Sequence, residues 1–111
     1  MTPRELTIDE ALALICLVRQ MVVADGVVSV AELAQMHEIG GKLGADMYAR
    51  AADLAEHEPP TVENSVARAA TITRKEAQEC VWQMLTDLAS ADGLDDTEQD
   101  LLNLVQEVWS H

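Results

Sequence analysis

Aromatic residues, cysteine, proline and glycine are all scarce in this chain of 111 residues. It has no Phe, two Trp, one Tyr, two Cys, three Pro and five Gly. The cysteines, Cys16 and Cys80, lie in apolar stretches without Cys-x-x-Cys spacing, so we expect two buried free thiols and no zinc or redox site. Nearly half of the residues are nevertheless hydrophobic. This composition predicts a globular, helix-rich protein and excludes a disordered one.

Basic residues are the second shortage. Seven Lys and Arg stand against 20 Asp and Glu, which gives a formal net charge of −13, and no Lys or Arg follows Lys75. Such a chain repels phosphate backbones, so we exclude nucleic-acid binding through a basic surface. The charge favours two kinds of partner, divalent cations and a basic protein surface.

No apolar run is long enough to cross a bilayer, which takes about 20 residues. The most apolar stretch, Ala11 to Val18, is ended by Arg19 and Gln20. The N-terminus also lacks the basic start and the small-residue cleavage site of a signal peptide. We therefore expect a cytoplasmic protein without direct membrane insertion, whose contact with a membrane would come through a membrane-associated protein partner.

Helix-start and helix-stop patterns are what the chain does contain. Three capping boxes, in which a hydroxyl and a carboxylate each accept from a backbone N–H, are Thr7-x-x-Glu10, Ser29-x-x-Glu32 and Thr73-x-x-Glu76. Stop patterns stand at Gly44 and Pro59-Pro60. Because no polar–apolar alternation is long enough for a strand, we predict an all-α bundle of about six helices. Their approximate bounds are 7–24, 29–43, 45–56, 62–70, 73–91 and 95–109.

The apolar positions predict which faces are buried. The first helix is apolar on most sides and is expected to be central. The third is expected to turn Met47, Ala51, Leu54 and Ala55 inward. Trp82 lies off the main apolar stripe of the fifth helix. We interpret it as a core residue between the two halves of the chain. The alternative is that Trp82 is exposed and anchors a protein partner.

The two halves of the chain are similar. Each has a capped helix that ends in Ala-Asp-Gly, at Ala24-Asp25-Gly26 and Ala91-Asp92-Gly93, followed by a second capped helix. This similarity predicts one domain over residues 1–111, built from two pseudo-repeats of helix–DG loop–helix. Repeat one covers about 7–43, the connecting helices about 45–70, and repeat two about 73–109.

The Asp-Gly turns are the candidate functional sites. At each turn a helix end offers carbonyl oxygens and the next helix start favours carboxylates, which are the oxygen ligands that hard cations prefer. A divalent metal ion is therefore the expected cofactor. Its candidate ligands are Asp25, Glu32, Asp92, Asp95, Asp96 and Glu98. A true EF-hand is excluded, because Met21 and Val23 would occupy its first and third positions. The alternative is that both turns are purely structural.

These motifs resemble the TerB-like family, that of the tellurite-resistance protein TerB, to which the N-terminal domain of the membrane-anchored DnaJ-like co-chaperone is similar. The resemblance implies a compact all-α domain with pseudo-twofold repetition, metal binding through acidic residues, and a role in stress-response complexes. Carried over by position, the acidic sites are Asp25 and Glu32, then Asp92 and Glu98. Ala31 departs from the pattern, because relatives often have an acid there, and the shortened second loop adds Asp95 and Asp96.

No catalytic residues are predicted. The chain has no Gly-rich phosphate loop, no nucleophile elbow and no His-Glu-x-x-His, and its three histidines are scattered. We therefore expect a non-enzymatic, TerB-like, cation-binding domain in a stress-response role. The alternative function is a protein–protein interaction module.

Overall fold

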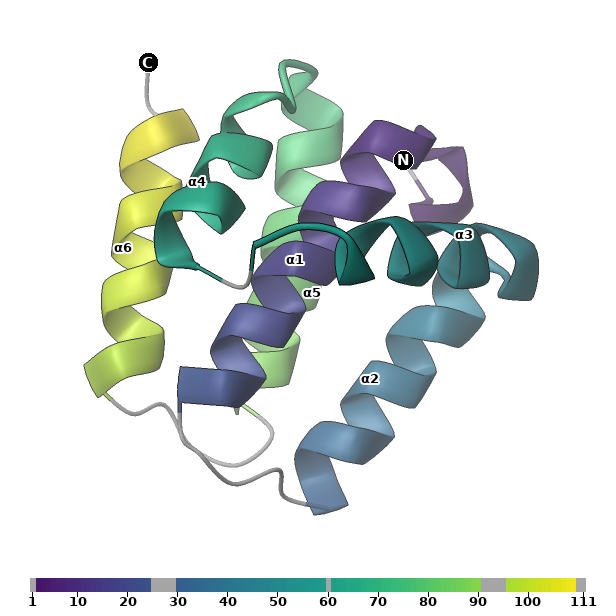
Figure 1. Ribbon diagram of the computed structural model, residues 1–111, viewed down its shortest axis with the longest axis horizontal. Helices are drawn as coiled ribbons and strands as arrows, with labels where there is room; N and C mark the ends of the chain where they lie inside the picture. Colours follow the sequence, from purple (N-terminus) through teal and green to yellow (C-terminus); the bar gives the residue numbers. More distant parts are fainter. Residues whose placement is uncertain (1, 25–29, 60, 91–95, 110–111) are drawn as a thin grey trace.

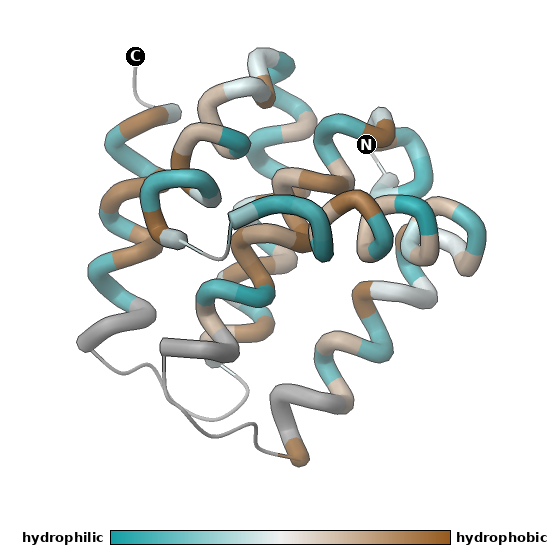
Figure 2. Tube along the Cα trace, viewed as in Figure 1, coloured by the Kyte–Doolittle hydropathy of each residue, from teal (hydrophilic) through white to brown (hydrophobic). Residues whose placement is uncertain are grey.

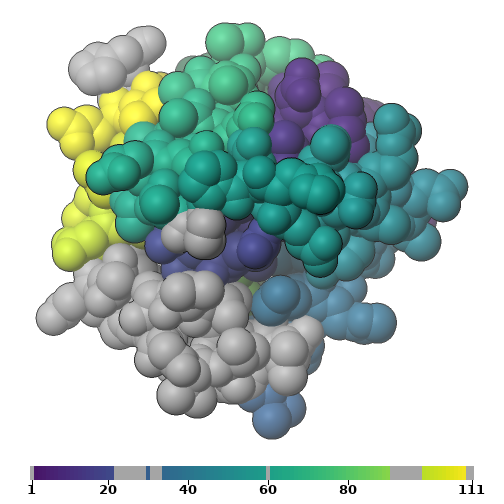
Figure 3. Space-filling model, viewed as in Figure 1, coloured from purple at the N-terminus to yellow at the C-terminus, as the bar shows by residue number. Residues whose placement is uncertain are grey.

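Helices account for nearly all of the chain that the computed structural model describes, which is residues 2–24, 30–59, 61–90 and 96–109, without the side chains of 22–24, 31–33 and 96–98. Within these ranges there is no strand, so the predicted all-α class is confirmed. The elements are η1 (Pro3–Glu5, a short 3-10 helix), α1 (Ile8–Ala24), α2 (Val30–Leu43), α3 (Ala45–Glu56), α4 (Val62–Ala70), α5 (Lys75–Ser90) and α6 (Asp96–Trp109) (Figure 1). They form a body of nearly equal dimensions, 32 × 29 × 26 Å, with a rounded outline in the space-filling view (Figure 3).

Helix α1 is the centre of this body, as its composition predicts. It contacts each of the other five α-helices (Figure 1). All eight residues from Ala11 to Val18 are buried, which only a helix surrounded on every side allows. The hydropathy of the trace shows the same arrangement, with apolar segments concentrated on the inner helices and hydrophilic ones outside (Figure 2).

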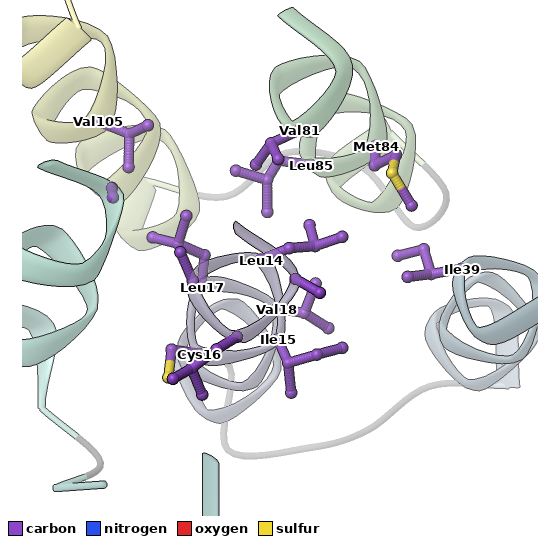
Figure 4. Packing of buried hydrophobic residues seen from close by; sticks show 14 of the residues in the cluster. Leu14, Ile15, Cys16, Leu17, Val18, Ile39, Val81, Met84, Leu85 and Val105 are labelled. Carbon is purple, nitrogen blue, oxygen red and sulfur yellow. The ribbon is translucent and has the colours of Figure 1, made fainter. Parts of the chain in front are cut away.

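The core is formed by aliphatic side chains that α1 directs at several neighbours (Figure 4). Leu14 faces Val81 and Leu85 of α5, and Leu17 lies on the side of α1 that faces Val105 of α6 (Figure 4). Since these residues come from both halves of the sequence, the core joins the two halves into one unit.

Local sequence signals explain most of the helix bounds. At the start of α1 the Thr7 amide donates to Glu10 Oε1 (2.8 Å), and the Glu10 amide donates to Thr7 Oγ1 (3.2 Å), so this capping box is confirmed. Gly44 separates α2 from α3 with φ 95° and ψ 143°, a conformation that side-chain-bearing residues rarely adopt. Thr61 accepts from the amide of Asn64 (3.1 Å) and so caps α4.

Three expectations about side chains are wrong in detail. Leu54 is 43% exposed, although α3 packs against both α1 and α2. The predicted capping box of Thr73 and Glu76 is absent, because α5 begins only at Lys75 and no hydrogen bond joins these two described residues. Arg74 between them instead donates a hydrogen bond to Glu10. Cys80 is only partly buried, although both cysteines are free as expected.

The predicted repeat has a counterpart in the packing. Helices α1 and α5 contact each other, and each of them contacts both α2 and α6. The segment that precedes α1 is η1, and it contacts α2, the helix that follows α1. In the same way α4 precedes α5 and contacts α6, the helix that follows α5. Because both Asp-Gly turns lie outside the described residues, the repeat and its boundaries remain a prediction.

None of the described helices combines the length and the apolar composition that a bilayer span requires.

Candidate functional site

The six acidic residues predicted to bind a metal lie outside the described residues or directly beside the undescribed segments. Asp25, Asp92 and Asp95 lie outside the described residues. The backbone of the other three occupies the first turn of α2 or α6, and their side chains are not described. These three are Glu32, Asp96 and Glu98.

The helix ends that flank the two turns share one end of the molecule. Helices α1 and α5 end there, at Ala24 and Ser90, and α2 and α6 begin there, at Val30 and Asp96 (Figure 1). We call this end the turn end. Two helix C-termini and two helix N-termini thus lie at the same end of the molecule, which offers both carbonyl oxygens and first turns that favour carboxylates.

Apart from Arg19 of α1, the basic residues of these helices lie at the opposite ends. Arg74 and Lys75 stand at the start of α5, and Lys42 stands in the last turn of α2. Helix α6 contains no Lys or Arg. A helix of the length of α5 spans about 24 Å, which is more than twice the Debye length of about 8 Å at physiological salt. These cations therefore do not neutralise the carboxylates predicted near the turn end.

One buried carboxylate is fully occupied by structural contacts. Glu10 is 6% exposed and accepts from Nε of Arg74 (2.9 Å) and from the Thr7 amide (2.8 Å). Hydrogen bonds from Arg74 hold the pKa of the Glu10 carboxyl below its usual value, against the opposing effect of burial. Arg74 also donates to the carbonyl of Glu5 (3.3 Å), so the pair ties η1 and α1 to the start of α5.

The second ion pair joins the end of α3 to α4. Nε of Arg68 donates to Oε1 of Glu58, and Asn64 Nδ2 donates to the same oxygen (3.4 Å). The hydrogen bond from Arg68 lowers the pKa of Glu58. Like Glu10, Glu58 therefore has a structural role.

The described residues do not form a catalytic constellation. His37 is exposed on α2, and His57 is exposed at the C-terminal end of α3. His111 lies outside the described residues. Burial raises the pKa of the Cys16 thiol, and also that of Cys80, which disfavours the reactive thiolate. Among the side chains that are described, no three His, Cys, Asp or Glu come together as a metal site.

The structure contains a tryptophan pair, of which the sequence analysis predicted only the core position of Trp82. The rings of Trp82 and Trp109 meet edge to face, with centroids 6.5 Å apart and planes at 72°. Both rings pack against the core, as we interpreted Trp82, yet both also line an open groove of about 410 Å³ between α5 and α6. The spacing within one helix cannot predict this pairing, because the partner ring comes from the last turn of another helix.

The comparisons with known proteins give one match. The family model described as tellurite resistance protein TerB matches residues 11–109, which is nearly the whole chain. Neither the curated proteins nor the solved structures contain a match. The matched region includes most of the central helix α1, both predicted Asp-Gly turns and the tryptophan pair. The chain therefore belongs to the family of the tellurite resistance protein TerB.

Proposed function

We propose that this TerB domain is a non-enzymatic protein that binds divalent cations at its turn end and serves a stress-response role. The proposed ligands are the carboxylates predicted from the sequence: Asp25, Glu32, Asp92, Asp95, Asp96 and Glu98. The observation that carries the proposal is that the four helix ends that flank both Asp-Gly turns lie at the same end of the molecule (Figure 1).

The charge distribution supports a cation as the ligand. The turn-end halves of α2, α5 and α6 contain no Lys or Arg, and the formal charge of the chain is −13. Arg19 of α1 is the single Lys or Arg in the turn-end halves of the four flanking helices. Neighbouring carboxylates repel one another, and a divalent cation relieves that repulsion while using the same oxygens as ligands. Binding should therefore stabilise the folded chain.

Thermal unfolding with added Ca²⁺, Mn²⁺ or Zn²⁺ tests the proposal. At a free cation concentration of 100 times Kd, a single site adds about 2.7 kcal/mol of stability. For a domain of this size such a gain raises Tm by about 10 °C. Asp25→Asn and Asp92→Asn should each remove a large part of this shift, because each replaces a charged ligand by a neutral amide.

Matched control variants separate a site from general charge screening. Asp53 of α3 and Glu63 of α4 are exposed acids away from the turn end. Asp53→Asn and Glu63→Gln should leave the cation-induced shift of Tm unchanged. An equal loss in all four variants would mean diffuse screening, and no shift with any of the cations would contradict the proposal.

A further inference from the structure

We propose that the groove between α5 and α6 is a docking site for a basic protein segment, which places a Lys or Arg side chain against the ring of Trp82. The groove has a volume of about 410 Å³ and its described lining is mainly aromatic and polar. It is lined by Lys75, Gln78, Glu79, Trp82, Gln83, Gln106 and Trp109. This surface is separate from the turn end, so the inference is independent of cation binding.

The two tryptophans have different structural roles. Trp109 donates from its indole Nε1 to the carbonyl of Ala69 (2.8 Å), which fixes the end of α6 to the end of α4. The indole N–H of Trp82 forms no hydrogen bond with any residue that the structure describes, and its ring is only partly buried. The Trp109 ring, 6.5 Å away at 72°, supports that of Trp82 from one side.

Trp82 therefore has the properties of a binding anchor. Its aromatic ring is held in place before a partner arrives, which lowers the entropic cost of association. Its indole N–H has no protein acceptor among the described residues and remains able to donate to a partner carbonyl. Tryptophans in such settings often account for a large part of the binding free energy of an interface.

The net charge of α5 and α6 favours a basic partner. These helices contain seven acidic residues and one basic residue, and of these Glu79 and Lys75 line the groove itself. Glu79 lies in the groove beside Trp82. A Lys or Arg side chain in this position gains a cation–π contact with the indole and a Coulomb contact with Glu79. A second copy of this chain is disfavoured, because it carries the same charge of −13.

A labelled peptide tests the proposal directly. The probe is an eight-residue peptide with four Arg and four Ala, and its twin has Gln at each Arg position. Fluorescence anisotropy of the labelled peptide should show binding of the Arg peptide and no measurable binding of the Gln twin. Trp82→Leu should weaken binding about tenfold, which is the range expected for a partly desolvated cation–π contact.

Further variants distinguish a specific groove from general acidity. Glu79→Gln should weaken binding severalfold, whereas Glu63→Gln on α4 should leave it unchanged. Trp82→Tyr keeps an aromatic ring and should retain most of the affinity, so it reports on the groove if the leucine variant does not fold. Equal binding by the Arg peptide and its twin, unchanged binding of the Arg peptide by the Trp82→Leu and Glu79→Gln variants, a Trp82→Tyr variant that loses most of the affinity, or no binding at all would overturn the proposal.

Discussion

A matched pair of leucine substitutions tests the central position of α1. Leu17 on α1 is completely buried, whereas Leu54 on α3 is 43% exposed. Both residues lie within helices, so the change to Ala is chemically the same at the two sites. The difference between their effects on the free energy of unfolding therefore measures burial alone.

The magnitude follows from the exposed fractions. Removing the isopropyl group of a buried Leu loses about 2–3 kcal/mol of transfer free energy. The cavity left at Leu17 adds to this, because side chains of α1 and α6 surround it, and brings the total to about 3–4 kcal/mol. At Leu54 nearly half of the side chain is already in water, so Leu54→Ala should cost about 1 kcal/mol or less.

Chemical denaturation of both variants at neutral pH gives these free energies. Leu17→Ala should lower Tm by roughly 12 °C or more, and Leu54→Ala by less than about 4 °C. Unfolding should remain two-state with an unchanged m-value, which makes the comparison valid. Equal losses in the two variants would refute the placement of α1 at the centre and of Leu54 at the surface.

Two further predictions concern Gly44 and Glu10. Gly44→Ala should lower the free energy of unfolding by about 1–3 kcal/mol, because φ is 95° there. Gly41→Ala within α2 should raise it by up to about 1 kcal/mol, since both sites have room for a Cβ and only the backbone conformation differs. Equal effects of the two substitutions in urea unfolding would contradict this prediction. The pKa of Glu10 is lowered in the folded state from 4.5, so its stabilising contribution is fully present above that pH and is lost as pH falls through the lower folded-state value. Glu10→Gln should thus destabilise the protein at pH 7 and by less in acid, and a deficit in Tm that does not shrink with pH would argue against the ion pair with Arg74.

The sequence predicted the helix order and most helix bounds, because strong local signals mark them. Helices α3 and α4 have the predicted bounds, since Gly44 stops α2 and the segment with Pro59 separates the next two helices. The burial of α1 was also predictable, because a helix that is apolar on most sides has few alternatives to a central position.

The errors arise where a distant residue outweighs a local pattern. Thr73 and Glu76 have the capping-box spacing, yet Arg74 between them binds Glu10, which is 64 positions away in the sequence. Gln78 instead donates its side-chain amide to the carbonyl of Ile72 (2.8 Å) at the start of α5. Leu54 belongs to an apolar pattern, but the neighbours of α3 decide which edge of that pattern is buried.

The candidate sites show the same division between local and distant information. The Asp-Gly motifs were recognisable because the same local pattern occurs twice in the sequence, but they lie outside the described residues, so the cation site stays a prediction. The pairing of Trp82 with Trp109 was not, because it depends on how α5 and α6 pack in three dimensions. The contact with Ala69 likewise joins residues 40 positions apart.

Paramagnetic broadening by Mn²⁺ in ¹H–¹⁵N correlation spectra is the most direct test of cation binding at the turn end. Substoichiometric Mn²⁺ should broaden the amide signals near the end of α1, the start of α2, the end of α5 and the start of α6. The signals of α3 and α4 should stay sharp, and excess Ca²⁺ should reverse the broadening if both ions share the site. Broadening centred elsewhere, or spread evenly over all acidic residues, would contradict a cation site built from the two Asp-Gly turns.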